Sequence, residues 1–156
     1  MQLVQCPGVY ERQDPAPLKL FIAGGISGCG DWQAELIGRL RQTGYCVFNP
    51  RRRDFPEGDA EASRRQIEWE HAHLAAADLV SFFFPPETLC PITLFELGKM
   101  AMSRRELYVG ADPGYARRKD VAIQLGLIRP EVRVVDTVEA LAGQLIARAQ
   151  GAARPG

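Results

Sequence analysis

A glutamate in an apolar context is the residue of this sequence best suited to chemistry. Glu96 stands between Phe95 and Leu97, and Gly98 follows at a point where a ligand needs room. A carboxylate in apolar surroundings is poorly solvated, which makes it available as a nucleophile or a general base. A capping box explains Glu96 equally well from the residues alone, with Thr93 as the cap and the glutamate bonding the first amide of a helix.

A glycine-rich loop covers residues 24–30 and holds four glycines in seven positions. Glycine lets the backbone turn tightly and approach a ligand, and the start of the following helix offers free amide groups to an anion. A phosphate or a sugar hydroxyl fits such a loop, with Ser27 as an additional donor. The loop has neither the Gly-Lys-Ser/Thr ending of a Walker motif nor the spacing of a dinucleotide fingerprint. It predicts a ligand contact without specifying a nucleotide.

Two charged features lie beside strand patterns. Arg51, Arg52 and Arg53 directly follow one predicted strand, where guanidinium groups can bind a phosphate through paired hydrogen bonds. A solvated loop with acidic neighbours explains these arginines equally well. Asp78 opens another predicted strand whose length, roughly 20 Å, would separate it from Glu96 and favours a turn or capping role.

Alternating strand and helix patterns predict how these residues are positioned. Short apolar runs occur at 18–23, 45–48, 79–84, 106–110 and 132–136, and helical patterns occur at 31–40, 61–77, 93–103, 114–126 and 137–150. This alternation is typical of a doubly wound α/β protein, with helices on both faces of a parallel sheet in three layers. For five strands it predicts the order 2-1-3-4-5, with ligands bound beyond the carboxyl ends of strands 1 and 3. The glycine loop and Glu96 follow those two strands.

The helix predicted over 61–77 holds Ile67, His71, Leu74 and Ala75 on one face. The first 17 residues hold three prolines and no steady period, which predicts an irregular arm. A single domain is expected over 18–150, followed by a frayed tail over 151–156.

The composition narrows the class of partner. The chain has 156 residues, with 19 basic and 19 acidic side chains and a formal net charge of zero. A balanced charge argues against a nucleic-acid polymer as partner, and no apolar run approaches the roughly 20 residues of a membrane span. The four cysteines lack the paired spacing of a disulfide framework or zinc site. Since no signal-peptide pattern is present, we expect a cytoplasmic protein. From the charge balance and the cysteine spacing we expect a small-molecule partner and no metal or cofactor.

Five stretches in the same order resemble the nucleoside 2-deoxyribosyltransferase-like family. They are residues 21–27 (FIAGGIS), 49–52 (NPRR), 77–80 (ADLV), 91–98 (PITLFELG) and 115–121 (YARRKDV). The resemblance covers about residues 18–126 and implies a flavodoxin-like fold with five parallel strands. It also implies cleavage or transfer at the N-glycosidic bond of a (deoxy)nucleoside or nucleoside 5′-monophosphate by a homo-oligomer.

The Glu-x-Gly context implies that Glu96 attacks the anomeric carbon and holds the sugar covalently. An aspartate after alanine is also characteristic of the family, which implies a catalytic role for Asp78. The residues expected to bind the substrate are Gly24, Gly25, Ile26, Ser27, Gly28, Arg51, Arg52 and Gly98.

Two departures from the family pattern leave the reaction open. Transferases of the family carry an acidic residue six positions before the nucleophile, where this chain has Cys90, and the common tyrosine of the first strand is Phe21. The base, the need for a phosphate, and transfer as opposed to hydrolysis therefore stay undetermined. A non-catalytic module that binds or senses a nucleotide or nucleotide-sugar, and an NAD-cleaving glycohydrolase, remain as alternatives.

Overall fold

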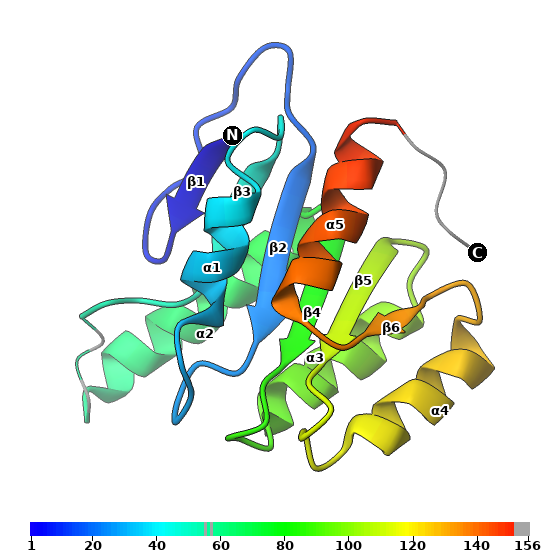
Figure 1. Cartoon of the computed structure of the whole chain (residues 1–156). Helices are drawn as coiled ribbons and strands as arrows, with labels where there is room; N and C mark the ends of the chain where they lie inside the picture. The colour runs from blue at the N-terminus through cyan, green and yellow to red at the C-terminus, as the bar shows by residue number, and fades with distance from the viewer. Residues whose placement is uncertain (55, 57, 152–156) are drawn as a thin grey trace.

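A parallel sheet forms the middle of three layers in the computed structural model, which describes residues 1–54, 56 and 58–151 (Figure 1). Within these residues its six strands are β1 (Gln2–Gln5), β2 (Lys19–Gly24), β3 (Cys46–Asn49), β4 (Leu79–Phe84), β5 (Glu106–Ala111) and β6 (Val134–Val135). They lie in the order β1-β3-β2-β4-β5-β6, and all neighbours are parallel. The doubly wound α/β class predicted from the alternation is the class observed.

The edge strand β1 corrects the expectation of five strands and, over Gln2–Gln5, the expectation of an irregular arm, whereas residues 6–18 form neither helix nor strand. The strands predicted from residue 18 onward keep their predicted relative order, and β1 extends the sheet beyond β3 with Gln2 opposite Cys46 and Gln5 opposite Asn49. Only Val4 of this strand is buried, so its four residues carry almost no hydrophobic signal. An edge strand is held by backbone hydrogen bonds to one neighbour, which the amino-acid pattern does not record. Of the predicted tail, residues 152–156 lie outside the described residues.

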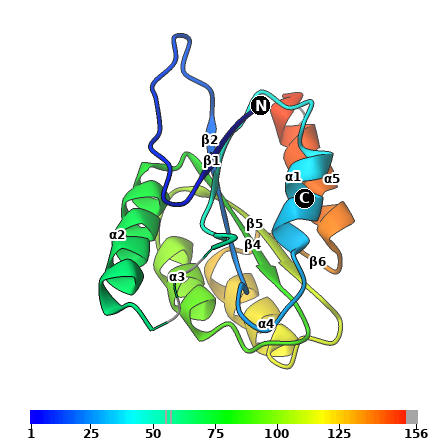
Figure 2. The same cartoon turned by 90° about the vertical axis from the view of Figure 1, so that its left-hand side faces the viewer.

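Five helices of the described chain cover the two faces of the sheet (Figure 2). One face packs against α1 (Trp32–Arg39) and α5 (Val138–Ala149), and the other packs against α2 (Ala60–Ala76), α3 (Pro91–Ala101) and α4 (Arg118–Ile128). Side chains of Asp31, Asp59 and Thr137 accept hydrogen bonds from first-turn amides and so start α1, α2 and α5.

The central strand β4 explains why the core has two halves. All six of its residues are buried, and alternate side chains enter opposite cores, as a strand covered on both faces requires. Phe82 and Phe84 pack on the side of α2, α3 and α4, whereas Phe83 packs on the side of α1 and α5. In the described part of the chain, none of the helices has the length and apolarity needed to cross a membrane.

Candidate active site

A cavity of about 350 Å³ lies beyond the carboxyl ends of β2 and β4. The chain leaves this point of the sheet in opposite directions, toward β3 on one side and toward β5 on the other, which is where doubly wound proteins bind ligands. Its wall is formed by Phe21, Ala23, Gly24, Gly25, Ile26, Ser27, Pro50, Glu70, Thr88, Cys90, Pro91, Ile92, Thr93 and Glu96. The glycine loop and Glu96, predicted to meet at this edge, do meet here.

Glu96 lies in the second turn of α3 and faces the cavity as a half-buried side chain. The helix begins at Pro91, two residues earlier than predicted, because proline suits the first helical position and Cys90 before it ends the loop at φ 48°. Thr93 is therefore inside the helix and buried, and no side chain caps the helix. The capping-box explanation of Glu96 is wrong, and the carboxyl group has no structural task at the helix start.

Glu70 on α2 is a second carboxyl in the cavity wall, and the sequence pattern does not reveal it. Of the face predicted to hold Ile67, His71, Leu74 and Ala75, only Leu74 is buried, and the other three residues are exposed. The helix is turned so that Ala62 and Trp69 are buried with Leu74. The polar residues Gln66 and Glu70 then sit half-buried, which a search for apolar periodicity overlooks. The one sequence signal for this face is the spacing of Gln66 and Glu70, since polar side chains four residues apart lie side by side on a helix.

The two carboxyl groups hold their protons more tightly than isolated glutamates do. Burial, and to a smaller extent the charge of Glu70, raise the pKa of Glu96 to about 7 against the opposing charge of Lys99. Burial also raises the pKa of Glu70, against a hydrogen bond from Gln66 that lowers it. Since two carboxylates in one cavity repel each other, ionisation of one carboxyl group favours the protonated form of the other, which leaves the pair singly protonated. In that form the site offers both a carboxylate and a carboxylic acid.

Cys90 cannot replace the acidic residue that transferases of the family carry at its position. Burial raises the pKa of its thiol to about 11, so the thiol stays neutral and is a poor proton donor near pH 7. Glu70 is the other carboxyl among the described residues of the wall. All four cysteines are free thiols, and no group of three metal-ligating side chains gathers in the part of the chain that the structure describes.

Close packing explains the paired glycines at the start of the loop. A Cβ atom on Gly25 would lie 2.8 Å from the Sγ atom of Cys90 and 2.8 Å from Cγ2 of Thr88, closer than real side chains approach. The glycine thus lets the loop after β2 touch the loop after β4. Of the loop residues expected to bind the substrate, Gly24, Gly25, Ile26 and Ser27 line the cavity, whereas Gly28 is exposed at φ 75° and lies outside its wall.

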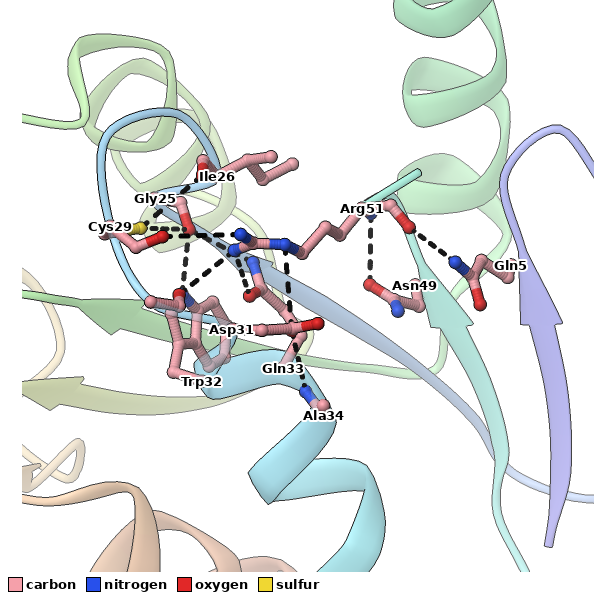
Figure 3. A network of polar contacts seen from close by, with 11 residues as sticks. Gln5, Gly25, Ile26, Cys29, Asp31, Trp32, Gln33, Ala34, Asn49 and Arg51 are labelled. Carbon is pink, nitrogen blue, oxygen red and sulfur yellow. Dashed lines mark hydrogen bonds and ion pairs between the residues drawn. The ribbon is translucent and has the colours of Figure 1, made fainter. Parts of the chain in front are cut away.

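Arg51 holds the glycine loop from outside the cavity (Figure 3). Its guanidinium group donates to the carbonyl oxygens of Gly30 at 3.0 Å and Cys29 at 3.3 Å and to Oε1 of Gln33 at 3.1 Å. An ion pair of 3.7 Å with Asp31 completes the arrangement. The carboxylate of Asp31 also caps α1, so this helix start already holds a negative group. The structure thus gives Arg51 a role in holding the loop, and its contact with a substrate stays a prediction.

Three other predicted site residues lie away from the cavity wall. Asp78 accepts a hydrogen bond from the backbone amide of Lys19 and pairs with its ammonium group at 3.7 Å, at the amino ends of β2 and β4. The structure thus separates Asp78 from Glu96 by the length of the strand. Gly98 borders a groove between α3 and α4, since two residues turn a helix by about 200°. Arg52 follows β3 and does not line the cavity.

Replacing Arg51 by methionine is expected to loosen the loop. Three charged hydrogen bonds are lost from a side chain that is 21% exposed, so we expect the free energy of unfolding to fall by about 2 kcal/mol. Urea titration measures this change. Arg53→Met is the control, because Arg53 is an exposed neighbour in the same loop. Equal stability of the two variants would contradict the structural role of Arg51.

The fold and the cavity together define an α/β protein with a two-carboxyl site at the switch point of its sheet. The family model described as nucleoside 2-deoxyribosyltransferase like matches residues 17–115, a range that contains the whole cavity wall, and the chain belongs to this family.

A solved structure supports the same architecture. The crystal structure of a conserved protein from Enterococcus faecalis V583 superimposes with a TM-score of 0.63 at 18% identity, covering 85% of this chain and 99% of the other. At this identity the likeness concerns the fold alone. Comparison with curated proteins finds no sequence that matches this chain.

Proposed function

We propose that this protein cleaves the N-glycosidic bond of a nucleoside, with Glu96 as the nucleophile and Glu70 as the acid, in the form of the pair in which Glu96 is ionised and Glu70 holds the shared proton. The observation that carries the proposal is the pair of half-buried carboxyl groups with raised pKa on one cavity wall. Family membership supports glycosyl transfer in the broad sense, and the Glu-x-Gly context of Glu96 matches the family nucleophile.

The chemistry is a double displacement. The carboxylate of Glu96 attacks C1′ of the sugar, the bond from C1′ to the base nitrogen breaks, and its electron pair leaves with the base. Glu70 gives its proton to the departing base, which leaves as a neutral molecule, and the sugar stays on Glu96 as an ester. Water or a second base then attacks C1′ and releases Glu96, while the carboxylate of Glu70 takes the proton of the attacking group.

The charge of the cavity favours a nucleoside over its 5′-monophosphate. Among the described residues of the wall there are two glutamates and neither lysine nor arginine. The guanidinium group of Arg51 bonds the loop instead. A phosphate dianion beside two acidic groups without a cation is repelled. We therefore expect kcat/KM for a deoxynucleoside to exceed that for its 5′-monophosphate by about tenfold or more, as measured by initial rates of base release.

The decisive experiment is incubation with ribo- and deoxyribonucleosides and their 5′-monophosphates, with and without a free acceptor base, followed by chromatography. The proposal predicts a free base without acceptor, or an exchanged nucleoside with it. Ligand-induced thermal stabilisation without any released base would instead indicate a binding module of the same fold. Adding NAD to the panel tests the glycohydrolase alternative through release of nicotinamide.

A further inference from the structure

The carboxyl group of Glu70 is connected to the N-terminal arm through one glutamine. Gln66, one turn before Glu70 on α2, donates from Nε2 to Oε1 of Glu70 at 2.7 Å and to the carbonyl oxygen of Pro50 at 2.7 Å. On its other side Oε1 of Gln66 accepts the thiol hydrogen of Cys6 at 2.9 Å. All polar atoms of the Gln66 amide are thus engaged with the arm, the end of β3 and the cavity wall.

The thiol of Cys6 and the carbonyl group of Pro50 together favour one orientation of the Gln66 amide. If the amide turned over, its oxygen would face the carbonyl oxygen of Pro50, which cannot donate a hydrogen bond, and its NH₂ group would face the thiol. A thiol hydrogen beside Oε1 favours the observed orientation. Because burial raises the pKa of Cys6 to about 11, this thiol keeps its hydrogen at neutral pH.

The arm is anchored on both sides of Cys6, so the thiol is a firm support. The amide of Cys6 donates to the carbonyl oxygen of Asn49 at 2.9 Å, and Nε1 of Trp69 donates to the carbonyl oxygen of Gly8 at 2.7 Å. Nε2 of Gln5 donates to the carbonyl oxygen of Arg51 at 2.9 Å, as Figure 3 shows. These bonds tie the arm to the end of β3 and to α2, the two segments that bring Pro50 and Glu70 to the cavity.

We propose that the N-terminal arm positions the catalytic acid: Cys6 orients Gln66, and Gln66 holds Oε1 of Glu70, so that Oε2 carries the proton for the departing base. Cys6 and Gln66 are positioning residues in this arrangement. The inference rests on the proposed function, because it assigns Glu70 the role of acid. It gives the first residues of the chain a part in the site although none of them lines the cavity.

The sign of the effect follows from the groups around Glu70. Glu96 faces it from α3, while the neutral thiol of Cys6 and the positive charge of Arg52 lie on the side of the arm and the β3 loop. The bond from Gln66 stabilises the ionised form of Glu70 and lowers its pKa. Loss of this bond therefore raises the pKa of Glu70 and frees the carboxyl group to rotate.

The test follows the titration of the Glu70 carboxyl carbon by NMR in the full chain labelled with ¹³C-glutamate, with Glu70→Gln identifying the signal. We expect Gln66→Leu and Cys6→Ala to move the Glu70 midpoint to higher pH, and Cys6→Ser to restore it. Cys46→Ala is the matched control, since Cys46 is another buried free thiol of the same core and lies at the opposite end of β3. In the base-release assay we expect kcat of Gln66→Leu to fall about tenfold with KM little changed.

The outcomes separate this inference from the proposed function. An unchanged Glu70 midpoint in Gln66→Leu overturns the positioning role, and equal midpoints in Cys6→Ala and Cys46→Ala overturn the role of the arm. Thermal melts show whether each variant is folded. If Gln66→Leu does not fold, Cys6→Ala still tests the hydrogen bonds that connect Cys6 to Glu70 through Gln66. If the wild type releases no base from any nucleoside, the proposed function fails, while the titration still decides whether the arm holds Glu70.

Discussion

Glu96→Gln is expected to lower base release by at least about a thousandfold with every nucleoside that the wild type accepts. Glutamine keeps the size of the side chain, but its neutral amide is a much weaker nucleophile than a carboxylate and cannot form an ester with C1′. Stopped assays with chromatography of the base measure the loss. Turnover within a few-fold of the wild type would exclude Glu96 as the nucleophile.

The stability of Glu96→Gln shows whether the variant is folded, and its difference from the wild-type stability is expected to depend on pH. The pKa of Glu96 is raised from its usual 4.5 to about 7 in the folded chain. Stability linked to protonated Glu96 is therefore complete below pH 4.5 and is lost as the pH rises through about 7. Glutamine cannot ionise, so relative to the wild type the variant is expected to be more stable at pH 8 than at pH 4. Thermal melts at pH 4 and pH 8 measure this change. If the stability difference between the variant and the wild type were the same at both pH values, the raised pKa of Glu96 would be refuted.

Glu70→Gln is expected to lower kcat for ordinary nucleosides by about a hundredfold to ten-thousandfold, the range typical of a lost general acid. The diagnostic substrate is p-nitrophenyl 2-deoxyriboside, whose leaving group departs without a proton. This substrate should restore rapid first-step chemistry to Glu70→Gln but not to Glu96→Gln. Equal losses on both substrates would show that Glu70 does not act as the acid.

Glu68→Gln is the matched control for Glu70→Gln. Glu68 lies two residues earlier on α2, is exposed, and pairs with Arg64 at 2.8 Å, so its loss should leave kcat within about twofold.

The pH profile gives a second measure of Glu70. In the wild type the acidic limb of the kcat/KM profile should lie near pH 7, because Glu96 must be ionised to attack C1′ and its pKa is raised to about 7. In Glu70→Gln the charge that raises the pKa of Glu96 is gone, so the acidic limb should move to lower pH. An acidic limb at the wild-type position would show that the two carboxyl groups do not interact.

Much of the fold could be predicted from the amino-acid pattern, because the period of apolar residues identifies strands and helices and their alternation restricts the order of a parallel sheet. The same reasoning placed the glycine loop and Glu96 at one sheet edge, and the strand length put Asp78 at the other. The edge strand β1 could not be predicted from this pattern, because backbone hydrogen bonds to β3 hold a segment whose side chains are mostly outside the core.

From residue 18 onward, the sequence by itself determined the order of the strands and helices, the position of the switch point and the placement of Glu96 beside it. The start of α3, the rotation of α2 that turns Glu70 inward, and the engagement of Arg51 with the loop were decided only by the tertiary structure. A helix's phase depends on which of its faces fits the neighbouring elements, and a polar side chain's role depends on partners distant in sequence. Gln66 illustrates the reason: its partners Cys6, Pro50 and Glu70 come from three segments that meet only when the sheet has formed.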